Sequence, residues 1–397
     1  MAHGRVWVGA VLLLAVAGTA AAQPVYPGVG IGGGGMMPVA PPATFLPGAP
    51  PLAADTPGTS IQALAGLADE HPPLKELPGG LPELIPAHDK HHGSGDHEIP
   101  GYLTPFVPTH GGWFTGGEFL LMRPRNSDLD YVIRNTGTGL ATTGPIDSLK
   151  YGQGTGLRAE VGRRYGEGKW ETAFAYTYFN GGGNSTLFAG GGVLLPTLTR
   201  PGLTDRAQTA TANVDLDYQL FDMLAARRVL VDEHFAVRWL GGFRFTDIRQ
   251  VLNAYYDGGD ARKAAVASRS RFQGFGPLVG AEAVLVGWKG LHLYTRASAG
   301  LISGRNVNRL LETNDSGATT YTNVNYDVRK VVPTGSIAIG GGWQYRTLSI
   351  RAGYEVTHWQ GIFERPRFTD DVSPGKVVTR PANLTLEGLF LQVGLSF

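Results

Sequence analysis

The sequence predicts an all-β fold, a transmembrane up-and-down antiparallel barrel of about ten strands within a range of about 8–14. Three observations predict it: an export signal at the start, a final segment that alternates up to an aromatic last residue, and nine similar segments before it. After the signal there is no run of about 18 apolar residues. A helix therefore cannot span a membrane here, and only a closed barrel could.

The first 22 residues have the pattern of a signal peptide. His3 and Arg5 precede an apolar stretch at 6–17, and small residues fill positions 20–22 before Gln23. This is the order of a basic region, an apolar region and an Ala-x-Ala cleavage site. A membrane-anchor helix fits less well, because the apolar stretch is short and a cleavage site follows it. We therefore expect the chain to be exported.

Composition agrees with an exported β protein. The chain contains 58 glycines and 10% aromatic residues, with 17% charged residues and a net charge of +1. There is no basic excess to indicate a nucleic-acid partner. Cysteine is absent, which excludes disulfides, thiolate metal sites and a thiol nucleophile. The fold must be held by its own core or by a bilayer.

Residues 23–110 are predicted to be a disordered periplasmic extension rich in Pro, Gly and His. This segment holds most of the 26 prolines and has few long apolar patterns, so it cannot bury enough apolar area to offset chain entropy. His88, His91, His92 and His97 are closely spaced within it. Imidazoles could bind zinc or copper weakly, but closing such a site in a flexible segment costs much entropy. We favour a solvated linker, with no metal and no cofactor.

Residues 111–397 are predicted to form the barrel. Ten alternating segments are separated by links that are short and long in turn, which is typical of barrels with short periplasmic turns and longer external loops. An even strand number leaves both ends of the barrel in the periplasm. The segments are 112–123, 155–165, 168–180, 206–220, 234–247, 270–287, 290–303, 332–345, 347–359 and 384–397.

The last segment shows the alternation most clearly. Its apolar residues from Leu389 through Val393 to Phe397 occupy every second position, so an extended strand places them on one face. A strand that ends on the final Phe is the signal read by the assembly machinery of bacterial outer membranes. We therefore expect Phe397 to act as an assembly signal, the apolar face to meet outer-membrane lipid, and the strand to pair with the one starting near Trp113.

Charged residues gather on the opposite face of the segments. If this face is the lumen, its acids and arginines have two alternatives: a wide lumen would let them line a water-filled pore, and a narrow one would make them pair across it. A purely stabilising role is equally open. The candidate pore-lining residues are Glu118, Arg158, Glu160, Arg164, Glu171, Asp215, Asp217, Arg238, Arg244, Glu282, Arg296, Arg351 and Glu355.

Several of these segments resemble known outer-membrane families. The stretches at 237–249, 272–282 and 343–354 are similar to the Legionella-type major outer membrane protein family, and Gly112-Trp-Phe-Thr-Gly-Gly-Glu-Phe-Leu-Leu121 also resembles planctomycete β-barrel porin-type surface proteins. The resemblance covers roughly 112–397 and implies a pore-forming barrel of the outer membrane. Members of the first family are associated with cysteine cross-links. Because this chain has no cysteine, such cross-linking does not carry over, and its oligomeric state is open.

No catalytic constellation stands out. His234, His292 and His358 are isolated, and neither a Ser-His-Asp order nor His-Glu-x-x-His spacing occurs. We therefore expect no enzyme activity. The sequence favours a porin-like barrel for passive diffusion of small solutes or ions in the bacterial outer membrane. The alternative is a closed structural or adhesive surface barrel without transport.

Overall fold

The computed structural model describes residues 111–137, 142–165, 169–231, 234–373 and 375–397. The expected signal peptide at 1–22, the extension at 23–110 and its histidines lie outside the described residues. Within them, no helix is long and apolar enough to cross a membrane. The two helices described are single 3-10 turns, η1 (Trp288–Gly290) and η2 (Asp315–Gly317).

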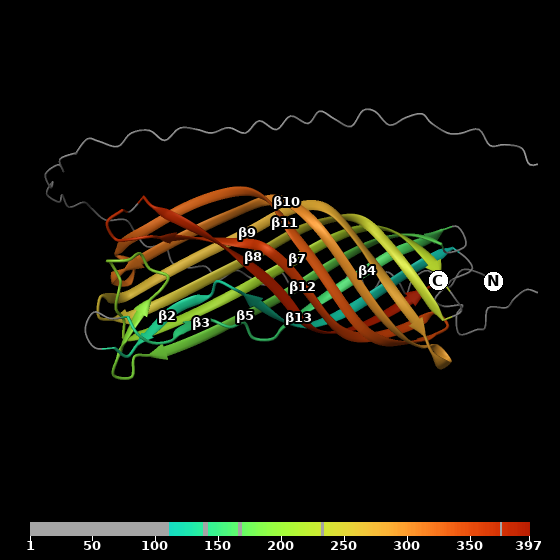
Figure 1. Cartoon of the computed structure of the whole chain (residues 1–397), viewed down its shortest axis with the longest axis horizontal. Coiled ribbons are helices and arrows are strands. Elements are labelled where there is room, and N and C mark those ends of the chain that lie inside the picture. The colour runs from blue at the N-terminus through green and yellow to red at the C-terminus, as the bar shows by residue number, and fades with distance from the viewer. Residues whose placement is uncertain (1–110, 138–141, 166–168, 232–233, 374) are drawn as a thin grey trace, which may run out of the picture. The chain divides into compact units, whose positions relative to one another are not determined.

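Ten strands close into one antiparallel barrel (Figure 1), which confirms the predicted fold class. Each strand pairs with its neighbours along the ring, and β13 pairs with β1. Every strand therefore has two partners, as a sheet in lipid requires, because the bilayer core offers no hydrogen bonds to a free edge. In ring order the strands are β1 (Gly112–Asn126), β4 (Gly154–Tyr165), β5 (Trp170–Phe188), β7 (Thr209–Leu230), β8 (Phe235–Gly258), β9 (Ala261–Val286), β10 (Leu291–Asn314), β11 (Thr319–Tyr345), β12 (Leu348–Phe368) and β13 (Val377–Ser396).

The terminal strand closes the ring as predicted. Its register places Leu395 opposite Thr115 and Leu391 opposite Phe119 of β1. The backbone N–H of Phe397 donates to the carbonyl of Trp113 over 2.8 Å. The start of β1 and the end of β13 therefore lie at the same end of the barrel, where the C-terminus is marked in Figure 1.

An apolar band surrounds the outside of the barrel at this end. Leu389, Leu391, Val393 and Leu395 on β13 point outward and are 40–56% exposed. On β8 the outward positions from 237 to 245 are also apolar or glycine. Nine residues at ~3.4 Å each, tilted by ~40°, span roughly 23 Å, close to the ~25 Å apolar height of outer-membrane barrels. The predicted outward orientation of the apolar face is correct in this band.

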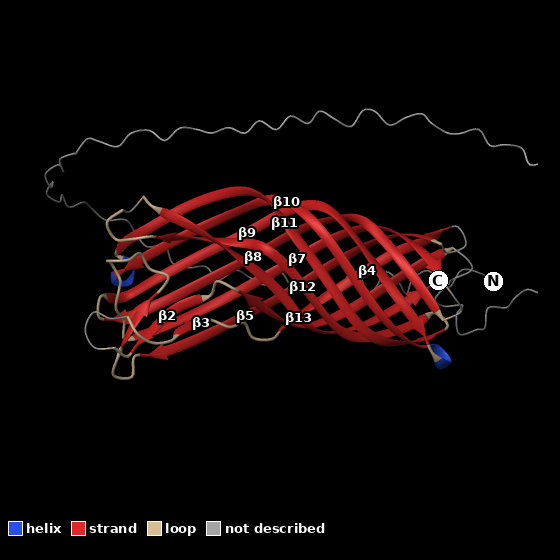
Figure 2. Cartoon of the chain, in the orientation of Figure 1, coloured by secondary structure: helices blue, strands red, loops and turns tan. Residues whose placement is uncertain are grey.

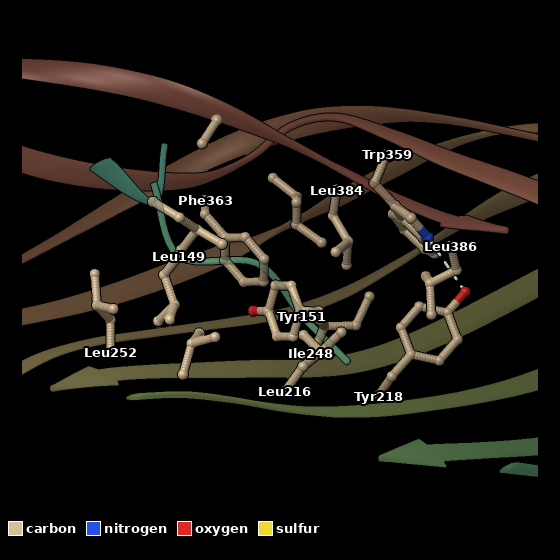
Figure 3. Packing of buried hydrophobic residues seen from close by; sticks show 14 of the residues in the cluster. Leu149, Tyr151, Leu216, Tyr218, Ile248, Leu252, Trp359, Phe363, Leu384 and Leu386 are labelled. Carbon is tan, nitrogen blue, oxygen red and sulfur yellow. Dashed lines mark hydrogen bonds between the residues drawn. The ribbon is translucent and has the colours of Figure 1, made fainter. Parts of the chain in front are cut away.

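Beyond the band the polarity of the two faces is reversed. We call this part of the strands the distal half; on β8 it runs from position 246 to the end of the strand. Here Ile248, Leu252 and Tyr256 point inward and are at most 2% exposed, whereas the outward positions carry Asp247 and Arg249. The distal half thus has the polarity of a water-soluble β protein, with a polar outside and an apolar core. Figure 3 shows part of this core.

The distal half explains where the predicted strands were too short. Links expected to be long loops at 248–269 and 304–331 are mostly strand, joined by tight turns at Gly258–Gly259 and at η2 (Figure 2). Both glycines adopt positive φ, 90° and 66°, which a turn this tight requires. The sequence there is polar because the outer strand face is in water, and that polarity was mistaken for loop.

The connection from β1 to β4 adds residues to the distal core. It carries β2 (Asp130–Asn135) and β3 (Ile146–Ser148), which form a small sheet with β6 (Val193–Pro196). Its buried apolar side chains include Tyr131, which is fully buried, and Leu149 and Tyr151, which lie among the interior side chains of the barrel (Figure 3). The Tyr256 hydroxyl of β8 donates to the Tyr131 carbonyl over 2.6 Å.

Candidate functional site in the barrel lumen

Inside the apolar band, the lumen contains a layer of charged residues that we call the charged belt. Eleven of the thirteen predicted residues point into it: Glu118, Arg158, Glu160, Arg164, Glu171, Arg238, Arg244, Glu282, Arg296, Arg351 and Glu355. Asp222 and Arg228 of β7 complete the set. Seven arginines therefore face six carboxylates.

Glu355 on β12 is at the centre of the first group of the belt. Both amino groups of Arg158 on β4 donate to it, over 2.9 and 3.0 Å, in the bidentate geometry that arginine and carboxylate favour. Arg296 on β10 donates to Glu355 over 2.7 Å. Arg158 also reaches Glu118 on β1 over 2.6 Å, and Arg296 lies 3.9 Å from the same carboxylate. Because β10 and β1 are four strands apart in the ring, this group extends across most of the lumen.

Glu171 on β5 is at the centre of the second group. Arg238 donates to it over 2.7 Å and Arg228 over 2.9 Å, and Arg164 lies 3.5 Å away. The Glu171 side chain is 2% exposed, so its charge depends on these arginines rather than on water.

Arg238 on β8 connects this group to others. It lies 3.7 Å from Glu160 on β4 and 3.7 Å from Glu282 on β9. Arg351 on β12 donates to the same Glu282 over 2.9 Å. The belt is therefore a connected set of ion pairs, several of which cross the lumen between non-adjacent strands, rather than a lining of independent charges.

Arg244 and Asp222 form a separate bidentate pair on adjacent strands β8 and β7, at 2.7 and 2.8 Å. Asp222 and Arg228 were missed by sequence reasoning. The missed signal was Phe221 and Met223, which face lipid and are 41% and 46% exposed. Successive side chains of a strand point to opposite faces, so the even-numbered residues of β7 here, including Asp222 and Arg228, point into the lumen.

Two predicted lumen residues were wrong. Asp215 and Asp217 point away from the interior, on the outer face of β7 in the distal half, where Asn180 donates to Asp217 over 2.7 Å. Their neighbours Val214 and Leu216 are fully buried instead. The prediction failed because it took the charged face to be inward along the whole strand, whereas the faces exchange polarity beyond the membrane.

An aromatic contact crosses the lumen next to the belt. The indole N–H of Trp359 on β12 donates to the hydroxyl of Tyr218 on β7 over 3.2 Å (Figure 3). The ring centroids are 6.1 Å apart in an edge-to-face arrangement. These two strands are five positions apart in either direction around the ten-stranded ring, so the contact joins opposite walls.

The chemistry available in the belt is mainly ion pairing. Its carboxylates are held by arginines, and arginine stays charged at any physiological pH. Within the described ranges, no group of three or more His, Asp or Glu side chains is arranged to hold a metal ion. The expectation that the chain is not an enzyme stays a prediction.

An all-strand closed ring with an apolar outer band defines an integral outer-membrane β-barrel. The family can then be stated: the model of the Legionella pneumophila major outer membrane protein precursor family matches residues 106–397, and the chain belongs to this family. The protein is thus located in the bacterial outer membrane. A search of curated proteins gives no significant match.

Solved structures of other outer-membrane barrels are similar to the chain at low identity. The Escherichia coli outer membrane protease OmpT has a TM-score of 0.44 and 9% identity, with 72% of this chain and 97% of OmpT covered. A Pseudomonas aeruginosa FadL homologue has a TM-score of 0.22 and 8% identity, with 75% and 92% covered. The P. putida toluene transporter TodX has a TM-score of 0.21 and 10% identity, with 75% of this chain and 92% of TodX covered. Similarities at these values say nothing of activity.

Proposed function

We propose that this protein is a closed outer-membrane barrel that carries a folded β-structure at the cell surface. The observation that carries the proposal is the hydrogen bond between Trp359 and Tyr218, because it joins opposite walls of the ring. A ten-stranded barrel with ~4.8 Å between strands and a ~40° tilt has a backbone diameter of roughly 20 Å. A large side chain from each wall is enough to close such an opening.

The charged belt supports the same proposal. A solute that crossed this layer would have to separate pairs such as Glu355 with Arg158 and Glu171 with Arg238, which approach to 2.9 and 2.7 Å. Removing one partner of a buried ion pair costs about 3–5 kcal/mol. Thermal opening of several such pairs at once is therefore rare.

The distal half supports a role at the surface. With both barrel ends at 111 and 397 in the periplasm, the distal half projects outward from the outer leaflet. Its outside carries exposed ion pairs, including Arg271 with Asp247 at 2.5 Å and Arg134 with Asp147 at 2.6 Å. Paired strands with short turns give this projection a fixed shape, which suits an adhesive or protective surface.

Passive diffusion of small solutes or ions is the second candidate, as the sequence favoured. One observation favours it: the lumen inside the apolar band contains the charged belt, and several inward positions, such as Gly116 and Gly394, have no side chain. On this account some belt pairs would have to rearrange to admit a solute.

Efflux from vesicles distinguishes the two candidates. Folded protein, verified by its heat-modifiable gel mobility, is reconstituted into vesicles loaded with a small sugar or with a dye that reports chloride. We expect efflux no faster than from protein-free vesicles, with a general diffusion porin as the positive control. Efflux that increases with protein and falls with solute size would overturn the closed-barrel proposal and support diffusion.

A further inference from the structure

One outer face of the distal half is rich in arginine. Six arginines on four consecutive strands point outward and are exposed: Arg249 on β8, Arg269 and Arg271 on β9, Arg305 and Arg309 on β10, and Arg329 on β11. We call them the arginine face. Two carboxylates, Asp247 and Asp327, lie among them, and a third, Asp217 on β7, lies directly opposite Arg249, which leaves an excess of three positive charges.

The strand register places these arginines directly opposite one another. Arg249 is paired with Arg271, Arg269 with Arg309, and Arg305 with Arg329. Like charges at directly opposed positions destabilise a sheet. Three such pairs on neighbouring strands are therefore a cost to the free barrel that a bound anion would remove.

Asp247 and Asp327 compensate only part of the face. Asp247 accepts hydrogen bonds from Nε and from one amino group of Arg271, over 2.9 and 2.5 Å, and Asp327 accepts one from Nε of Arg305 over 2.9 Å. Among the described residues no ion pair involves Arg249, Arg269, Arg309 or Arg329. Each directly opposed pair thus has at least one guanidinium whose donors are open to an outside partner.

The arginine face lies immediately beyond the apolar band. The last lipid-facing row on these strands includes Phe245 opposite Phe275, which are 47% and 52% exposed. The first charged row, with Asp247 opposite Gln273, is two residues further along the same strands. At ~3.4 Å per residue and a ~40° tilt, the face begins roughly 5 Å beyond the lipid contact. That is the depth of lipid headgroups.

We propose that the arginine face binds the phosphate groups of phosphorylated lipid headgroups in the outer leaflet. The guanidinium donates two parallel hydrogen bonds to phosphate and does not lose its charge. The excess positive charge complements these anions, and the surface is continuous with the band that lipid already covers. The proposal holds whether the lumen is closed or open.

Thermal unfolding in micelles tests the proposal. The folded full chain is placed in zwitterionic detergent with added diphosphoryl lipid A, monophosphoryl lipid A or phosphatidylcholine. We expect Tm to rise most with two phosphates, less with one, and not with phosphatidylcholine. The apparent affinity should fall with added salt. A Tm that does not depend on the number of phosphates would overturn the proposal without any variant.

Substitutions then locate the site. The double variant Arg269→Gln/Arg309→Gln should weaken binding of diphosphoryl lipid A by about tenfold or more, while its Tm without lipid stays equal or rises, since an opposed pair is removed. The control Arg262→Gln/Arg134→Gln loses the same charge elsewhere, at an exposed turn end and on β2, and should bind like the wild type. An equal loss of affinity for diphosphoryl lipid A in both double variants would overturn the assignment of the site. Equal stabilisation by soluble inorganic phosphate would overturn lipid as the partner.

Discussion

Replacing Trp359 by alanine tests whether the barrel interior is packed. The side chain is fully buried, and its N–H donates to Tyr218 on the opposite wall. Deleting a buried Trp side chain typically costs about 3–5 kcal/mol, from lost contacts and the cavity left behind. Trp359→Phe keeps most of the volume and loses the hydrogen bond, so it should cost only about 1–2 kcal/mol.

The matched control is Trp239→Ala, which makes the same chemical change on the lipid-facing side of β8. Trp239 is 60% exposed, so detergent fills the space that its side chain leaves. We expect a loss of no more than about 2 kcal/mol. Urea unfolding in micelles, followed by far-UV circular dichroism and heat-modifiable mobility, gives the free energies. Equal losses for Trp359→Ala and Trp239→Ala would refute a packed interior.

Three further outcomes are expected. Glu355→Gln should lower the free energy of unfolding by about 3–5 kcal/mol, because Arg158 and Arg296 lose their shared carboxylate; a loss below about 1 kcal/mol in the same urea titration would contradict the pairing. Burial raises the pKa of Glu312, in the distal half, from 4.5 to about 7. The stability that the folded state gains by holding this proton is therefore fully present below pH 4.5, falls as pH increases and is lost as pH rises through 7. Glu312→Gln should remove this slope from a stability–pH profile, and an unchanged slope would contradict the assignment. Deleting Phe397 should reduce insertion into the outer membrane, measured by cell fractionation, and undiminished insertion would count against an assembly role.

The membrane-spanning half of the fold could be predicted from the sequence. In water or in lipid, successive side chains of a strand point to opposite faces, and the sequence of β13 shows this alternation of apolar and other residues as far as Phe397. Once the lack of an apolar run of about 18 residues had excluded a transmembrane helix, the apolar residues from Leu389 to Leu395 were expected to face lipid. The same parity placed Glu355 and Arg158 in the lumen correctly.

The distal half could not be predicted in this way. Periodicity tells which residues share a face of the strand but not which face is inward. The apolar face points outward in the membrane and inward where the barrel leaves it. Asp215 and Asp217 share their face of β7 with the lipid-facing Phe221. Their charge alone predicts the lumen, whereas the alternation of β7 predicts the outside, because Asp215 and Asp217 are an even number of residues from the outward-facing Phe221. The positions of Arg249 and Arg271 opposite one another depend on strand register, which a single sequence does not determine.

Ion current through a planar bilayer tests the closed lumen most directly. Folded protein is inserted at low density, and current is recorded at fixed voltage in salt solution. Because Trp359 and Tyr218 join opposite walls and the charged belt is paired, we predict no discrete current steps above those of the protein-free bilayer. Reproducible steps of uniform size, appearing with insertion of the folded wild-type chain, would contradict the closed barrel.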